Sequence, residues 1–391
     1  MSNKDLDRFL LVEGDFVYPP NHGGRVDAWN RIVTIHDMGG YIHLVCTVKE
    51  QPRNDYMEIV KKYVDEITIL PRKNRLRDML YNRPLQMVSR RCLKNIKFEK
   101  TYDYMILNGS YVYDIVDNPT LKVAHKILRM NNDEAIYFRG LAQATSSWVK
   151  KIYYYWESRK FKAFDETLIK KIPNVMFVSH DELKDYKRKY PWMNGCFLPT
   201  AVSLNFKRRT RTSNCVLMVG SFFMVNNQEG IRFYIEHVHP LLNDIPNYKL
   251  MIAGNSRGQS IKWLEKIAQE YNNIDIFDSP DDLEPLYDEA AVFVNPMLHG
   301  AGVKLKTINA VIEGLPVVAT SVGNEGTGLQ DGRDIIVTDN AKEIAHNIIK
   351  LFEEEQFAKN IIDNGQNYVK ENYNQKKSLL YFLTNLSESE C

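Results

Sequence analysis

Short apolar runs alternate with stretches of helical period along most of the chain. In the first half the runs are RFLLVEG, YIHLVCTV, EITIL, YDYMILN and KVAHKIL, at residues 8–14, 41–48, 66–70, 102–108 and 122–128. Helix-length segments at 25–38 and 54–63 separate the first three of them. Parallel strands need connections of this length, and near-continuous apolar runs are typical of strands buried on both faces. The first half is therefore predicted to form a parallel sheet covered by helices.

The same alternation restarts after residue 213. The apolar runs lie at 214–221, 248–255, 273–279, 290–296, 315–320 and 334–339, with helical segments that begin near Glu229 and cover 261–270 and 304–313. The predicted fold class is α/β, with two doubly wound Rossmann-like domains. Ligands of such sheets bind beyond the carboxyl ends of the strands, so we expect the site in a cleft where the two domains face each other.

The length of 391 residues also favours two domains rather than one hydrophobic core. Residues 1–200 are expected to form the N-terminal, acceptor-binding domain, and 213–370 the C-terminal, nucleotide-sugar-binding domain. The polar, basic segment 201–212 is expected to link them. Residues 371–391 should form a C-terminal helix and tail that can pack back on the N-terminal domain.

Charge is distributed unevenly between the two halves. Residues 1–200 carry 33 Lys and Arg against 24 Asp and Glu, a net charge of +9, whereas the remainder carries 18 against 25, a net of −7. Two basic segments, 72–100 and 148–162, also contain large apolar and aromatic residues, which suits a membrane surface or a phosphorylated lipid as well as a solvated helix with a buried stripe. No nucleic-acid recognition motif accompanies the charge.

Several classes of protein lack support in the sequence. The apolar run 9–12 is too short for a signal peptide or a membrane span, so we expect a cytoplasmic protein, in part peripheral on the inner face of the cell membrane. The five cysteines show no paired spacing, and no hydrolase or metalloprotease motif occurs. Neither a catalytic metal nor a cofactor is expected.

Glycine-containing loops follow several of the predicted strands. Gly23 and Gly24 begin a predicted helix, where backbone N–H groups can bind an anion, although a glycine pair is more often only a turn. Gly302, Lys304 and Lys306 follow the run at 290–296, so that backbone, helix dipole and ammonium groups would converge on a diphosphate. The loops that contain Gly220 with Ser221, and Gly254, belong to the same predicted edge of the second sheet.

The order of these motifs resembles that of the GT-B glycosyltransferases, in particular the retaining family 4, the group 1 glycosyltransferases that build bacterial surface polysaccharides. The resemblance covers nearly the whole chain and is strongest in PMLHGAGVKLKTINAVIEGLPVVATSVGNEG, residues 296–326. It implies transfer of a sugar from a nucleotide-sugar donor to a hydroxyl of a growing lipid-linked glycan in capsule, exopolysaccharide or O-antigen, with retention and without a metal.

The resemblance also implies roles for individual residues. It assigns donor binding to Gly23, Gly24, Gly220, Ser221, Gly254, Gly302, Lys304, Lys306, Asn309 and Glu325, and catalysis to Asn131 and Lys304. Two positions depart from the family pattern: Asn131 stands where the family has a histidine, and Asn309 where it has a glutamate that binds the ribose. A catalytically impaired subunit that binds a glycan or a partner transferase is therefore the alternative, and an epimerase of the same fold is a weaker one.

Overall fold

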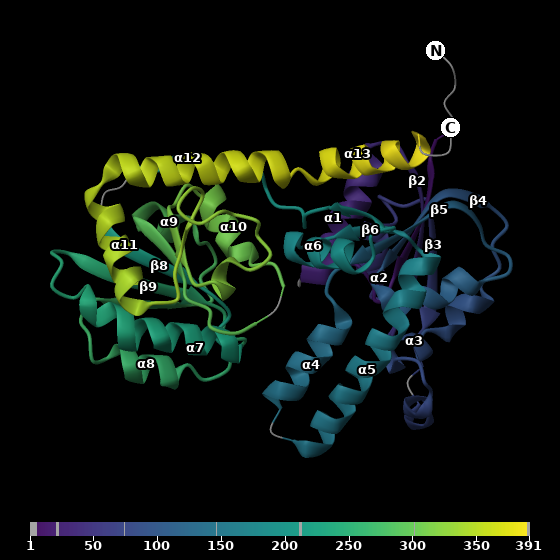
Figure 1. Ribbon diagram of the computed structural model, residues 1–391, viewed down its shortest axis with the longest axis horizontal. Helices are drawn as coiled ribbons and strands as arrows, with labels where there is room; N and C mark the ends of the chain where they lie inside the picture. Colours follow the sequence, from purple (N-terminus) through teal and green to yellow (C-terminus); the bar gives the residue numbers. More distant parts are fainter. Residues whose placement is uncertain are drawn as a thin grey trace, which may run out of the picture. The chain divides into compact units, whose positions relative to one another are not determined.

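The computed structural model describes residues 6–20, 23–73, 75–145, 147–210, 213–300 and 302–388. The chain divides into two compact units, each an α/β structure built on one parallel sheet (Figure 1). The first unit comprises Met1–Ala201 and Gln375–Cys391, and the second comprises Val202–Asn374. The predicted fold class is thus confirmed for both halves of the chain.

The first unit contains a parallel sheet of seven strands in the order β3-β2-β1-β4-β5-β6-β7. The strands are β1 (Arg8–Glu13), β2 (Tyr41–Val48), β3 (Glu66–Pro71), β4 (Thr101–Asn108), β5 (Lys122–Met130), β6 (Asn174–Phe177) and β7 (Asn194–Phe197). The helices are α1 (Gly23–Asp37), α2 (Asn54–Val60), α3 (Leu85–Val88), α4 (Glu134–Ala144), α5 (Trp148–Lys171), α6 (His180–Lys189) and α13 (Gln375–Glu388). The four-residue strands β6 and β7 were not predicted, because such short runs have no clear period.

Both faces of this first sheet are buried, as its apolar runs predict. Phe9 and Leu11 of β1 pack in one cluster with Ile32 of α1, and Leu379 of α13 joins that cluster. Leu10 lies in the cluster on the opposite side, since successive side chains of a strand point to opposite faces. The C-terminal helix α13 is therefore part of the core of the first unit.

Helices α4 and α5 form a hairpin in the first unit (Figure 1). Phe138 of α4 stacks on Phe161 of α5, with ring centroids 5.4 Å apart. Ser158 Oγ donates a hydrogen bond of 2.7 Å to the carbonyl of Ala135. This contact fixes the start of α4 against the middle of α5.

The second unit contains six parallel strands in the order β10-β9-β8-β11-β12-β13. They are β8 (Asn214–Val219), β9 (Tyr248–Gly254), β10 (Ile274–Asp278), β11 (Val292–Asn295), β12 (Val317–Ala319) and β13 (Ile336–Val337). The helices are α7 (Val225–Phe233), α8 (Lys262–Ala268), α9 (Glu284–Glu289), α10 (Leu305–Ile312), α11 (Ala341–Glu353) and α12 (Glu355–Asn372). Its core includes Val216 of β8, Ile252 of β9 and Ile348 of α11.

The segment expected to link the domains is fixed to the second unit where it is described. Lys207 N donates to the carbonyl of Ile312 over 2.9 Å. The nearly buried side chain of Arg209 pairs with Glu284 at 2.9 Å and with Glu313 at 2.6 Å. Residues 207–209 are therefore held by backbone hydrogen bonds and ion pairs, while residues 211 and 212 lie outside the described part of the chain.

Candidate functional site

The centre of the second sheet is a point where the chain connections change direction. β8 lies between β9 and β11, and later strands continue on the β11 side. Ligands of open parallel sheets bind at such a point, beyond the carboxyl ends of the two strands. Gly220 and Ser221 follow β8, and the loop that leads to Lys304 follows β11. The predicted donor-binding loops thus converge at one place on the second unit.

The glycine at the end of β9 is required by close packing. A Cβ atom on Gly254 would lie 2.0 Å from the carbonyl oxygen of Gly220. Asn227 of α7 holds the same loop, because its Nδ2 donates to the carbonyl of Ser221 over 3.1 Å. These contacts explain why Gly254 has no side chain, and its proposed contact with the donor stays a prediction.

Lys304 is a buried residue whose ammonium group already has three partners. Its Nζ donates to the carbonyl of Gly302 at 2.6 Å, to that of Gly300 at 3.4 Å and to Glu325 Oε2 at 3.0 Å. The structure thus brings together three of the predicted residues, Gly302, Lys304 and Glu325. An ammonium has only three donors, so Lys304 must exchange a partner before it can bind a ligand directly.

Lys306 has unused donors among the described residues. Its Nζ makes one hydrogen bond with them, of 3.0 Å, to Asn227 Oδ1. Burial, together with the nearby charge of Lys304, lowers the pKa of Lys306 to about 8. An anion bound here would compensate both effects, so Lys306 is the residue best suited to hold a diphosphate.

Asn227 was not among the predicted site residues. It lies in the first turn of α7, contacts both Lys306 and the Ser221 carbonyl, and lines the same small cavity as Gly220. It belongs to the segment VGSFFMVNNQEG, residues 219–230, which also contains Gly220 and Ser221, but only the fold shows that its side chain reaches α10. Asn309, by contrast, is exposed on α10. Its predicted contact with the ribose stays a prediction.

The other predicted residues belong to the first unit. Gly23 and Gly24 begin α1 and are exposed, as a site for an anion at a helix N-terminus requires. Asn131 follows β5, and its Nδ2 donates to Asn108 Oδ1 over 2.7 Å. Its Oδ1 is buried without a hydrogen-bond partner in the described structure.

Asn131 belongs to a buried polar network under the ends of the first sheet's strands. Asn108 donates to Glu13, and Glu13 accepts from Arg31 at 3.0 Å. Asp27 lies between Arg31 and Arg129, at 2.7 and 2.6 Å. Apart from Asn131, which is half-buried, each of these residues is at most 4% exposed. Ion pairs of this kind fix the ends of β1, β4 and β5 because breaking one leaves an uncompensated buried charge.

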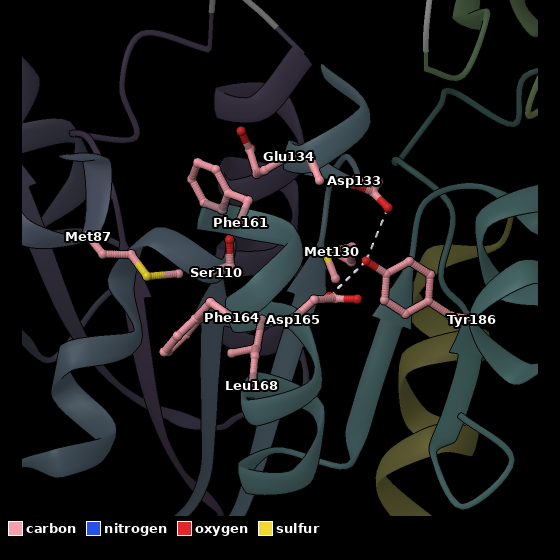
Figure 2. Close-up of a pocket in the computed structure, with 11 residues that line it drawn as sticks. Met87, Ser110, Met130, Asp133, Glu134, Phe161, Phe164, Asp165, Leu168 and Tyr186 are labelled. Carbon is pink, nitrogen blue, oxygen red and sulfur yellow. Dashed lines mark hydrogen bonds between the residues drawn. The ribbon is translucent and has the colours of Figure 1, made fainter. Parts of the chain in front are cut away.

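Glu134, at the start of α4, lies beside two cavities of the first unit. One is small and lined mainly by apolar side chains, among them Met87, Phe161 and Phe164 (Figure 2). In the same view Tyr186 donates hydrogen bonds to Asp165 at 2.9 Å and to Asp133 at 3.3 Å. Burial, and secondarily the charge of Asp133, raises the pKa of Glu134 to about 7. Glu134 therefore exchanges a proton near neutral pH and was missed by the sequence analysis.

Within the described ranges, no group of three or more His, Cys, Asp and Glu side chains is arranged to hold a metal ion. In that same part of the chain, no helix combines the length and the apolar character needed to cross a membrane.

A family model matches the second unit of this chain, and one relative matches nearly all of it. A sequence model described as Glycosyl transferases group 1 matches residues 213–354, within the second unit. A Klebsiella pneumoniae protein, named an uncharacterized 44.6 kDa protein in the cps region, is 35% identical over 383 residues, covering 95% of this chain and 98% of that one.

Solved structures show the same fold over nearly the whole chain. TarM from S. aureus gives a TM-score of 0.70 at 12% identity and covers 99% of both chains. HepE from Anabaena, solved in complex with UDP-glucose, gives a TM-score of 0.61 at 11% identity and covers 97% of this chain and 98% of that one.

Proposed function

This chain belongs to the group 1 glycosyltransferases, enzymes of the GT-B fold, and we propose that it transfers a sugar from a nucleotide-sugar donor to a hydroxyl of a lipid-linked surface glycan. The observation that carries the proposal is the pair of lysines at the strand ends of the second sheet. Lys304 holds the loop after β11, and Lys306 retains free donor capacity beside Asn227. The complex of HepE with UDP-glucose supports a UDP-sugar as the donor class.

We further propose that transfer proceeds with retention and without a metal ion. The leaving group is a nucleoside diphosphate, whose developing negative charge needs hydrogen-bond donors and positive charge. Lys306, the N-terminal end of α10 and, after release of Glu325, Lys304 supply both. Asn131 cannot act as an acid or base, so it would act by hydrogen bonding to a substrate hydroxyl through its unpartnered Oδ1.

A panel of nucleotide sugars tests the donor site. One of them should raise the melting temperature of the protein, because a ligand that binds the native state stabilises it. Lys306→Gln should remove most of that shift, whereas Lys262→Gln, at an exposed lysine of α8, should retain it. Absence of a shift with every nucleotide sugar would contradict the proposal.

A lipid-linked acceptor is supported by one face of α5. Its exposed large residues are Trp148, Val149, Ile152, Tyr155 and Trp156, which recur at the spacing of a single helix face. The exposed cations Lys151, Arg159 and Lys162 fall on the same face by this spacing. Aromatic residues mixed with cations suit the headgroup region of an anionic membrane. We therefore place peripheral membrane contact on this face of the hairpin.

Vesicle sedimentation tests this contact. The double variant Trp148→Ser, Ile152→Ser should reduce binding to vesicles of phosphatidylglycerol and phosphatidylcholine by roughly tenfold or more, since two large side chains would no longer insert. Tyr381→Ser provides the control, because Tyr381 is 70% exposed but lies on α13. Equal binding by all three proteins would refute the assignment of this face.

A further inference from the structure

A cavity of about 290 Å³ opens at the centre of the first sheet. β1 and β4 are neighbours there, and β2 continues on one side and β5 on the other, so the cavity lies where the direction of the connections changes. Gly14 after β1 and Asn108 at the end of β4 line it, together with Gly24 of α1. Its size is close to the lower limit for small-molecule sites, about 300 Å³.

Arg90 lies in the wall of this cavity and forms no direct ion pair with the described residues. The residue is 4% exposed. Its guanidinium donates only to neutral acceptors: Thr47 Oγ1 at 3.0 Å, the Gln86 carbonyl at 2.7 Å and the Gly14 carbonyl at 2.9 Å. The guanidinium also lies 4.7 Å from the centre of the Tyr111 ring. No carboxylate of the described residues lies within ion-pair distance of it, an unusual situation for a buried cation.

Arg72 brings a second guanidinium to the same cavity. Its Nε is buried and has no hydrogen-bond partner in the described structure. The charge of Arg72 acts on Arg90, and burial together with this repulsion lowers the pKa of Arg90 to about 10. Two guanidinium groups that repel each other at one cavity indicate a binding site whose counter-charge comes from a ligand.

The acidic groups of the cavity, all among the described residues, do not form ion pairs with Arg72 or Arg90. Glu13 accepts hydrogen bonds from Arg31 and Asn108, and Asp15 pairs with Arg25 at 2.7 Å. Glu134 lines the cavity as well, but it is largely desolvated and titrates near neutral pH. When protonated, Glu134 can donate its O–H to a bound oxyanion.

We propose that this cavity binds a phosphoryl group of the acceptor substrate between the guanidinium groups of Arg72 and Arg90. Guanidinium groups suit phosphate because their parallel N–H donors match two phosphate oxygens. A doubly charged phosphoryl group also balances two cations better than a single carboxylate does. The identification of the ligand as the acceptor rests on the proposed function. Binding of phosphate by this cavity depends on the first unit alone.

The test compares two variants against two ligands by isothermal titration. Inorganic phosphate should bind wild-type protein, and Arg72→Gln should weaken that binding at this site by about tenfold or more, because a charged hydrogen bond is lost. Lys306→Gln should instead weaken binding of uridine diphosphate. Arg75→Gln is the matched control, since Arg75 is exposed and lines neither cavity.

A third variant tests the sign of the charge effect. Glu134→Gln removes a carboxylate from the cavity and should strengthen phosphate binding severalfold above neutral pH.

A further variant, Arg90→Lys, tests the second guanidinium. Lysine keeps the positive charge at this buried position, so the fold should be retained, as checked by circular dichroism, while phosphate binding should weaken. Pyrophosphate that binds more tightly than phosphate would indicate a diphosphate-linked lipid as the source, and equal binding a phosphomonoester.

Three results would overturn the proposal. The first is phosphate binding that Arg72→Gln leaves unchanged, and the second is phosphate binding that only Lys306→Gln removes. The third is tighter binding of glucuronate than of phosphate, which would assign the cavity to a carboxylate. If the wild-type protein binds phosphate but not uridine diphosphate, that result would instead contradict the proposed function and leave this site standing.

Discussion

The binding of a nucleoside diphosphate should depend on pH through Lys306. In the unliganded protein, burial and Lys304 lower the pKa of Lys306 from 10.5 to about 8. A diphosphate beside the ammonium favours its charged form, so the pKa should return toward its ordinary value on binding. The ligand therefore prefers protonated Lys306, and its affinity should be complete below about pH 8 and fall as the pH rises above it.

The two pKa values set the size of the effect. Binding should be about tenfold weaker at about pH 9 than at about pH 7, and close to one proton should be taken up per ligand near pH 9. The phosphate groups of the ligand do not contribute in this range, because their last ionisation lies near about pH 6. Replacing Lys306 by Gln should weaken binding at about pH 7 by roughly ten- to a hundredfold and abolish the dependence on pH.

Isothermal titration calorimetry with uridine diphosphate measures both quantities. Titrations at each pH in two buffers of different ionisation enthalpy give the number of protons taken up. Lys262→Gln should behave like the wild type, and uridine, which has no phosphate, should show no proton uptake. Proton uptake that persists in Lys306→Gln, or wild-type affinity that does not change up to about pH 9, would refute the placement of the diphosphate beside Lys306.

Three further predictions concern stability and are measured by urea unfolding. Gly254→Ala should destabilise the protein by about 2 to 3 kcal/mol, because its Cβ would lie 2.0 Å from a carbonyl oxygen, whereas Gly140→Ala, in open space on α4, should be neutral or slightly stabilising. Asp27→Asn should cost about 3 to 5 kcal/mol, because two buried arginines lose their shared carboxylate, while Asp185→Asn, in an exposed ion pair, should cost less than about 1 kcal/mol. Burial lowers the pKa of His239 to about 4, so protonation favours the unfolded chain, and stability should fall by about 2 kcal/mol from about pH 7 to about pH 5. His239→Phe should remove that part of the pH dependence, and an unchanged slope would contradict it.

The fold class follows from the sequence because its signals are local. The run FLLV in β1 is apolar at every position, and in the structure Phe9 and Leu10 indeed pack on opposite faces of the sheet. The family is equally visible in the sequence, since residues 296–326 keep the order of glycines, lysines and strand that the group 1 glycosyltransferases have. Strand and helix periods extend over a few residues, so they survive without knowledge of tertiary contacts.

The basic segment 72–100 shows where the local pattern is insufficient. Composition allowed a membrane surface or a solvated helix, yet Arg90 is buried and Arg72 lines the cavity of the first unit. Arg90 lies between α3 and η2 (Arg91–Asn95), and its guanidinium reaches the carbonyl of Gly14 after β1. The backbone next to Arg72 is joined to the same segment, because Lys73 N donates to the carbonyl of Ser89. No spacing along the chain encodes that contact.

The donor-binding loops were likewise predicted from the sequence only in part. The apolar runs alone predict that Gly220, Lys304 and Lys306 follow strands of a parallel sheet, because each of these residues comes after such a run. The partners of the two lysines depend on the folded chain: Lys304 donates to Glu325 and two carbonyls, whereas Lys306 donates to Asn227. The strand order brings these loops together, and burial then lowers the pKa of Lys306. Both effects depend on contacts between residues that are distant in the chain.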